Sequence, residues 1–183
     1  MPNEPFAAPE RYTIARATLA DLDVAIALYE DAARWLVARG IDQWRPGDYT
    51  REWARDNIER DEMYLAWRDG AAVGKFTLVW DDPEVWGEQP PDAGYLHGLA
   101  TARSEAGRGL GVTLLRYAAR RVAAAGRRYL RLDCTASNQA LRDYYTRAGF
   151  THVEDKWHGG WGASLFEQTV DAVDTVNIEE RDK

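Results

Sequence analysis

The sequence predicts an α/β fold in which one mixed sheet of about seven strands carries about four helices on its two faces. Two observations lead to this prediction. An apolar hairpin closes around the turn Arg68-Asp69-Gly70 early in the chain, which indicates antiparallel pairing. Later, an amphipathic helix at 110–125 joins two strands, and a strand–helix–strand unit requires parallel pairing. A sheet with both kinds of pairing is mixed.

The remaining elements follow from periodicity and from capping residues. The expected strands are 12–16, 63–67, 72–80, 94–101, 129–134, 150–154 and 163–170. The first helix begins at a capping box, Thr18 to Asp21, and ends at Gly40. Its apolar stripe is Leu22, Ile26, Tyr29, Ala33 and Leu36. The other expected helices are 50–59, 110–125 and 137–148, and the helix at 110–125 carries the stripe Leu110, Leu114, Ala118, Val122 and Ala125.

These elements fit one domain over residues 11–170, which is a length that can bury a core without disulfides. Residues 1–10, with three prolines, are expected to be flexible. Residues 171–183 form an acidic tail, in which Val173, Val176 and Ile178 leave an additional edge strand open.

Composition limits the function classes. The single cysteine, Cys134, excludes an intrachain disulfide and favours a reducing compartment. The first residues contain no apolar run that resembles a signal peptide or a membrane span, so we expect a cytoplasmic protein without a membrane partner. A net charge of −7 disfavours nucleic acid as a partner. A local group of arginines is either a solvated helix face or an attraction for a phosphorylated ligand: Arg116, Arg120, Arg121, Arg127, Arg128 and Arg131.

A glycine-rich turn, residues 106–111, lies between a strand and a helix. Glycines let the backbone curl around a ligand, and a helix N-terminus offers unpaired N–H groups to a phosphate. Val112 stands where a Walker loop needs lysine and where the dinucleotide fingerprint needs glycine, so both motifs are excluded. The turn by itself leaves two interpretations open, a phosphate or pyrophosphate site and a plain helix entry.

Two segments resemble the signature motifs of the GNAT superfamily of N-acetyltransferases. Tyr95 to Thr101 followed by Arg108-Gly109-Leu110-Gly111 is similar to its motif A, and Asn138 followed by Tyr144 to Phe150 is similar to its motif B. The resemblance extends over residues 11–170 and implies a central, mostly antiparallel sheet. The sequence departs from the family at Ala106, where glutamine or arginine is usual, and we expect weaker CoA binding there.

The resemblance implies that acetyl-CoA is the co-substrate. The backbone of Leu99, Ala100 and Thr101 would pair with the pantetheine arm, which Asn138 would also contact. The backbone N–H groups of the turn would hold the pyrophosphate, and this set consists of Gly107, Arg108, Gly109, Leu110 and Gly111. Arg103, Arg108 and Arg116 would supply a positive field for the phosphates.

Acetyl transfer to an amine requires a base and an acid. The resemblance assigns the general acid to Tyr145, whereas Tyr144 is expected to be a core residue. His97 has a suitable ordinary pKa for the base and lies where arylalkylamine acetyltransferases carry a histidine. A water relay and a structural role for His97 remain open, and no metal is expected.

The acceptor is expected to be a small amine that carries a positive charge or an apolar body. The loop at 81–92 is acidic and begins with Asp81. Three tryptophans, Trp44, Trp80 and Trp86, lie in or beside the loops that flank the acceptor side in this family. Acids and indoles together suit a cationic amine, although the alternative is a loop that is simply solvated.

Three alternatives remain open at this stage. A non-catalytic acyl-CoA-binding module would keep the fold and lose turnover. Acylation of a protein terminus or of aminoacyl-tRNA would use the same fold on a macromolecule, and longer acyl donors are also possible. The sequence leaves the oligomeric state open, including a homodimer.

Overall fold

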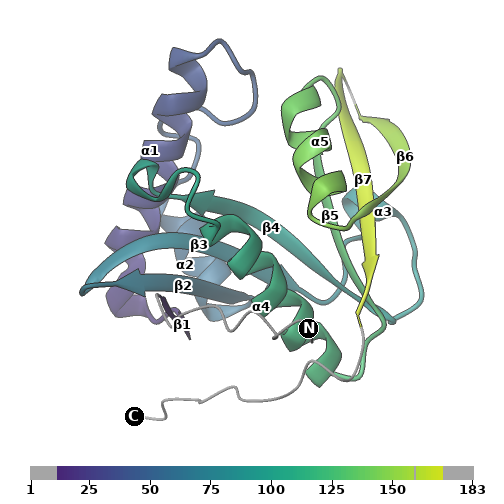
Figure 1. Ribbon diagram of the computed structural model, residues 1–183, viewed down its shortest axis with the longest axis horizontal. Coiled ribbons are helices and arrows are strands. Elements are labelled where there is room, and N and C mark those ends of the chain that lie inside the picture. The colour runs from purple at the N-terminus through teal and green to yellow at the C-terminus, as the bar shows by residue number, and fades with distance from the viewer. Residues whose placement is uncertain (1–11, 159, 171–183) are drawn as a thin grey trace, which may run out of the picture.

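The computed structural model describes residues 12–158 and 160–170, and the expectations for residues 1–10 and for the tail from residue 171 lie outside them. Seven strands form one sheet (Figure 1): β1 Thr13–Arg16, β2 Glu62–Arg68, β3 Ala71–Val79, β4 Ala93–Thr101, β5 Tyr129–Thr135, β6 Thr151–His158 and β7 Trp161–Thr169. Their order across the sheet is β1-β2-β3-β4-β5-β7-β6. Among the described pairs only β4 and β5 run parallel, so the predicted mixed, mostly antiparallel sheet is confirmed.

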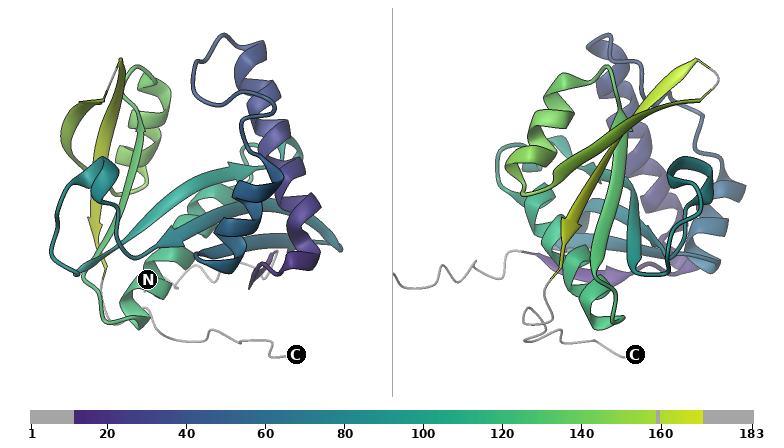
Figure 2. Two further views of the ribbon diagram at one scale, coloured as in Figure 1. Left: turned by 180° about the vertical axis from the view of Figure 1, so that it is seen from behind. Right: turned by 90° about the vertical axis from the view of Figure 1, so that its right-hand side faces the viewer.

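Five helices accompany the sheet: α1 Leu22–Ala38, α2 Arg51–Glu59, α3 Pro83–Trp86, α4 Leu110–Ala124 and α5 Gln139–Arg147. Helices α1 and α2 cover one face of the sheet, and α4 and α5 cover the other (Figure 2). None of the described helices is both long enough and apolar enough to cross a bilayer.

Local signals account for most of these boundaries. The predicted capping box is present, with the Thr18 backbone N–H donating to Asp21 at 2.8 Å. Asp69 and Gly70 both have positive φ, as a tight hairpin turn between β2 and β3 requires. Helix α5 begins two residues later than predicted because the Asn138 side chain caps it. The short helix α3 was not predicted within the acidic loop.

Two apolar clusters lie on opposite faces of the sheet. Below α4, the described core includes the predicted stripe up to Val122, whereas Ala125 is exposed because the helix has already ended. Below α1 and α2, Met63 and Leu65 of β2 pack against Tyr29 and Tyr49. Strands β3 and β4 are therefore covered on both faces, which holds the central strands rigid.

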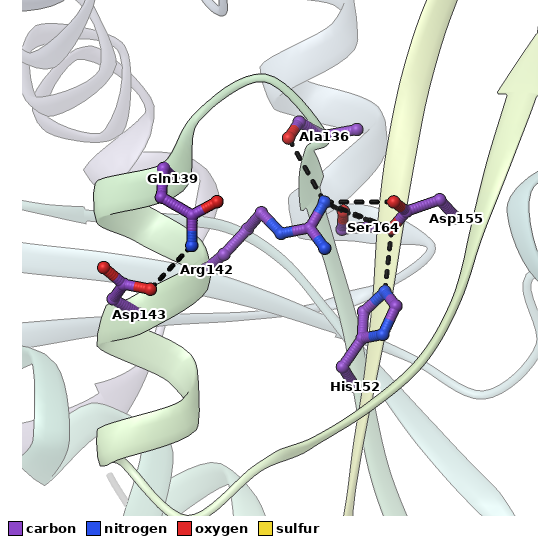
Figure 3. A network of polar contacts seen from close by, with 7 residues as sticks. All are labelled: Ala136, Gln139, Arg142, Asp143, His152, Asp155 and Ser164. Carbon is purple, nitrogen blue, oxygen red and sulfur yellow. Dashed lines mark hydrogen bonds and ion pairs between the residues drawn. The ribbon is translucent and has the colours of Figure 1, made fainter.

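A polar network fixes α5 to the outer strands (Figure 3). Nη1 of Arg142 donates to Oγ of Ser164 at 2.6 Å and to Oδ2 of Asp155 at 3.1 Å. The Asp155 carboxylate also accepts from Ser164 and lies 2.7 Å from Nε2 of His152. These bonds, those of Ser164 and His152 first, lower the pKa of Asp155 to about 2. The network holds the helix that carries the predicted catalytic tyrosine against the sheet.

Candidate active site

A pocket of about 850 Å³ opens where β4 and β5 separate. The parallel pairing of these strands ends at Leu96 and Leu132, although β4 continues to Thr101 and β5 to Thr135. Figure 1 shows the two strands diverging, with α5 beside the open end of β5. The pocket side of β4 therefore presents backbone groups that β5 does not pair, and an extended ligand can pair with them instead.

All the predicted cofactor-binding residues except Arg108 line this pocket. Gly107 and Gly109 have φ of 72° and 82°, and neither has an atom within 4 Å of the position that a Cβ would take. Gly109 is the N-cap of α4 and has no side chain to cap it, so the first N–H groups of the helix are left available to a ligand. A phosphate fits this turn by hydrogen bonding and by the helix dipole.

The buried carboxylate of Glu105, which the sequence analysis did not single out, anchors the glycine turn at residues 106–111. The Glu105 side chain is buried, and Nη1 of Arg68 lies 2.7 Å from its Oε1. The hydroxyl of Tyr12 donates to Oε2 of the same carboxylate at 2.6 Å. These contacts connect the glycine turn to β2 and to the residue that precedes β1.

Asn138 connects the two sides of the pocket. Its Oδ1 accepts from the backbone N–H of Leu141 at 3.1 Å, and its Nδ2 donates to Oε1 of Gln43 at 3.2 Å. Gln43 belongs to the loop after α1, and it lines the pocket too. The predicted pantetheine contact is thus already oriented by two hydrogen bonds.

His97 lines the pocket on β4 and lies between two carboxylates. Its Nε2 is 3.3 Å from Oδ2 of Asp82, and its Nδ1 is 4.0 Å from Oδ1 of Asp133. Burial alone would lower the pKa of His97, but Asp82 first, then Asp133 and Asp61, outweigh burial and raise it. The imidazole is about one-third exposed, which leaves it open to a ligand.

Helix α3 explains the position of Asp82. Asp82 is the N-cap of α3, with one carboxylate oxygen accepting from the backbone N–H of Val85 at 3.4 Å. The other oxygen is buried and lies 3.3 Å from Nε2 of His97. The unpredicted turn of helix therefore directs this carboxylate inward, while the neighbouring Asp81 stays exposed.

The same three side chains offer a possible metal-binding set. One ligand atom each from Asp82, His97 and Asp133 lie within 4.8 Å of one another, and no other such group occurs among the described residues. Imidazole and carboxylates are ligands that divalent cations accept. The expected absence of a metal therefore stays a prediction.

Two adjacent tyrosines lie on the opposite wall of the pocket. Tyr145 is buried, with its ring against Phe150 and Phe166, and it also lines the pocket. Burial, first of all, raises the pKa of Tyr145, which keeps the phenol protonated. Tyr144 also lines the pocket, and its hydroxyl lies where a Cβ on Gly111 would be, so it touches the phosphate turn rather than only the core.

A family model described as "Acetyltransferase (GNAT) family" matches residues 25–150. The chain belongs to the GNAT acetyltransferase family. The chain is also 31% identical, over 181 residues, to the uncharacterized N-acetyltransferase YesJ of Bacillus subtilis, a match that covers 88% of this chain and 98% of that protein. The predicted enzyme class, an acyltransferase, is confirmed.

Solved structures of GNAT proteins share the fold. A GNAT acetyltransferase from Listeria monocytogenes superposes with a TM-score of 0.72 at 26% identity, covering 86% of this chain and 94% of that one. The PaiA N-acetyltransferase of Thermoplasma acidophilum, solved in complex with coenzyme A, gives a TM-score of 0.69 at 20% identity over 86% and 98% of the two chains.

The GNAT fold brings only one of the four predicted acceptor residues into the pocket. Trp44 lines it and stacks on Tyr29, with ring centroids 4.9 Å apart. Trp86 is instead buried in a core cluster with Tyr95, because α3 turns it inward. Trp80 donates to Glu62 and packs on the α4 side. The exposed Asp81 also lies outside the pocket lining, and its neighbour Asp82, which does not line the pocket either, reaches the site through its contact with His97.

Proposed function

We propose that this GNAT protein transfers the acetyl group of acetyl-CoA to the primary amine of a small, cationic acceptor by direct attack. The proposal rests on one observation, the position of His97. This side chain lies on the pocket wall between the carboxylates of Asp82 and Asp133. The glycine turn at the start of α4 supports acetyl-CoA as the donor. The related PaiA structure with coenzyme A supports the same donor.

An acceptor amine must lose a proton before it attacks. With an ordinary pKa near 10.4, about one amine in a thousand is neutral at pH 7, so deprotonation costs about 4–5 kcal/mol. His97 accepts this proton directly or through one water molecule. Asp82 stabilises the imidazolium that results, and the two carboxylates attract the ammonium form of the acceptor.

Attack on the thioester forms a C–N bond and a tetrahedral oxyanion, and collapse of the oxyanion breaks the C–S bond. The attacking nitrogen, which becomes positively charged, passes its second proton to water, and water returns a proton to Tyr145 after the thiol has formed. Backbone N–H groups of β4 beyond Leu96, where β5 no longer pairs with it, would stabilise the oxyanion. Tyr145 then donates its phenolic proton to the CoA thiolate, and its raised pKa ensures that the proton is present. No residue in this sequence of steps requires a metal.

Release of the CoA thiol from acetyl-CoA, measured with a panel of amines, tests the proposal. We expect thiol release that depends on the amine, with acceptors whose amino group is protonated at neutral pH preferred over acceptors of equal size whose amino group is uncharged. A peptide with a free N-terminus serves as the macromolecular control. A rise in melting temperature with CoA but no thiol release with any acceptor would instead indicate a non-catalytic acyl-CoA-binding module.

A further inference from the structure

Lys75 is a fully buried cation beside the pocket that the reaction above does not use. It lies in the middle of β3 opposite Ala100 of β4, and only 1% of its surface is exposed. Its Nζ lies 4.8 Å from the ring centroid of Tyr49 and 5.9 Å from that of Tyr29. Lys75 therefore points toward the face covered by α1 and α2, between aromatic rings that continue to Trp44 on the pocket wall.

This ammonium has no anionic partner within the part of the chain that the structure describes. No carboxylate oxygen of residues 12–158 or 160–170 lies within 4.0 Å of Nζ of Lys75. Burial is the cause that lowers the pKa of Lys75 to about 8, and no neighbouring charge acts against it. An unpaired buried cation is costly, and aromatic faces replace only part of the lost hydration. A protein that keeps such a cation next to its pocket keeps a site for an anion.

A glycine separates this cation from the pocket. Gly98 lines the pocket, and a Cβ at this position would lie 3.2 Å from Nζ of Lys75. Gly98 has a φ of 61°, and it stands where the register of β3 and β4 shifts between Lys75 and Thr77. The wall between the ammonium and the pocket therefore has no side chain, and the flexible lysine stem allows Nζ to turn toward a ligand there.

The charges around Gly98 have opposite signs on its two sides. His97, the residue before it, is flanked by Asp82 and Asp133, which suit an ammonium group. Lys75 lies beneath Gly98 itself and suits a carboxylate. A ligand that carries an amine and a carboxylate on neighbouring carbons satisfies both groups at once, whereas a simple amine leaves Lys75 unpaired.

We propose that Lys75 binds the carboxylate of the acceptor, so that the acceptor is a free amino acid or a compound with the same α-amino carboxylate group. This inference rests on the proposed function, because the amine is placed at His97. The acyl group of the donor can also carry a carboxylate, as in succinyl-CoA. The experiment distinguishes a carboxylate of the acceptor from a carboxylate of the donor.

The test compares acceptors that differ only in the carboxylate. Rates of thiol release from acetyl-CoA are measured with phenylalanine and 2-phenylethylamine, and with leucine and 3-methylbutylamine. We expect the wild-type protein to prefer the amino acid of each pair. In Lys75→Met, the ratio of kcat/KM for amino acid to kcat/KM for amine should fall by about 10–100-fold, as expected for a lost bond to a charged group. Lys156→Met removes a lysine that bonds the Trp86 carbonyl at a distance from the pocket, and it should keep the wild-type ratio.

The outcomes distinguish failure of this inference from failure of the proposed function. If the wild-type protein has a kcat/KM for the amines that equals or exceeds its kcat/KM for the amino acids, the inference is contradicted and amine acetylation still holds. This comparison uses the wild-type protein alone. An unchanged ratio in Lys75→Met contradicts it too. Preference for succinyl-CoA over acetyl-CoA, lost in Lys75→Met, assigns the anion to the donor and overturns it. Failure of both members of each pair, and of every other amine of the panel, to release thiol overturns the proposed function as well. A melting temperature of Lys75→Met at or above the wild-type value shows that the change in ratio does not come from unfolding.

Discussion

Nε2 of His97 lies 3.3 Å from a buried oxygen of Asp82, in a loop 15 residues earlier in the chain. The contact exists because Asp82, as the N-cap of α3, has one carboxylate oxygen bonded to that helix and the other directed toward His97 in the middle of β4. It orients the imidazole, raises its pKa and leaves the other ring nitrogen facing Asp133. This pair, rather than the general acidity of the loop, is the feature on which the proposed acetylation chemistry rests.

Asp82→Asn should lower kcat/KM by about 10–100-fold, because a bond to a charged group contributes about 1.5–3 kcal/mol. The carboxylate raises the pKa of His97, so its loss should move the rising limb of the pH–rate profile to lower pH. Asp81→Asn is the matched control, since Asp81 is exposed, whereas the carboxylates that lie beside His97 are those of Asp82 and Asp133. Identical profiles for the two variants would contradict the role given to Asp82.

Tyr145→Phe should lower kcat by about 10²–10⁴-fold with little change in CoA affinity, because it removes the phenolic proton and keeps the ring packing. Tyr144→Phe should mainly raise the KM for acetyl-CoA, since the Tyr144 hydroxyl touches the phosphate turn at Gly111. Steady-state kinetics of both variants check this. A larger loss of kcat in Tyr144→Phe would exchange the roles of the two tyrosines.

Gly109→Ala should abolish the rise in melting temperature that CoA produces, which corresponds to about 2.7 kcal/mol at 100 times Kd. Its φ of 82° is unfavourable for alanine, so the turn must distort. Gly126→Ala imposes the same kind of strain at the other end of α4, where φ is 72° and the surroundings are open, but far from the turn. We expect that variant to be less stable and to keep the CoA shift. Equal CoA shifts in both variants would remove the phosphate site from this turn.

Removal of metal ions with a chelator should leave kcat/KM unchanged, because the proposed function gives His97 the role of a base and not of a ligand. Added Zn²⁺ should inhibit, since Asp82, His97 and Asp133 offer it three ligands and binding occupies the imidazole. Loss of activity on chelation, restored by a single metal, is the result that would reassign this group as a metal centre.

The fold followed from signals that are local in sequence. Alternation of apolar residues, the Asp69-Gly70 turn and the helix caps predicted nearly every element, since each depends on neighbours a few residues apart. Helix α3 was missed because four residues are too few to show helical periodicity. Without α3, the sequence pattern could not predict which side chains of the acidic loop face inward.

The position of the glycine turn at the pocket was predictable because a motif fixes the backbone there, whereas tertiary packing selects among neighbours elsewhere in the candidate site. Asp81 and Asp82 are equivalent in sequence, and only the N-cap geometry of α3 selects Asp82. Trp86 was expected beside the acceptor, but it fills a core cluster. One pattern in the sequence could have indicated the buried Lys75, because it is a charged residue in a predicted strand whose neighbouring residues are apolar or small.

The pH dependence of kcat/KM in His97→Gln, beside the wild-type protein, tests the central claim most directly. For the wild-type protein we expect a limb that rises with pH through a pKa above the ordinary histidine value, because the raised pKa keeps the imidazole protonated to higher pH. In His97→Gln that limb should disappear and kcat/KM should fall by about 10²–10⁴-fold, leaving only the rise due to the amine itself. His152→Gln, which changes the exposed histidine beside Asp155, should keep the wild-type profile. A wild-type limb that persists in His97→Gln would show that another group, and not His97, takes the proton from the acceptor.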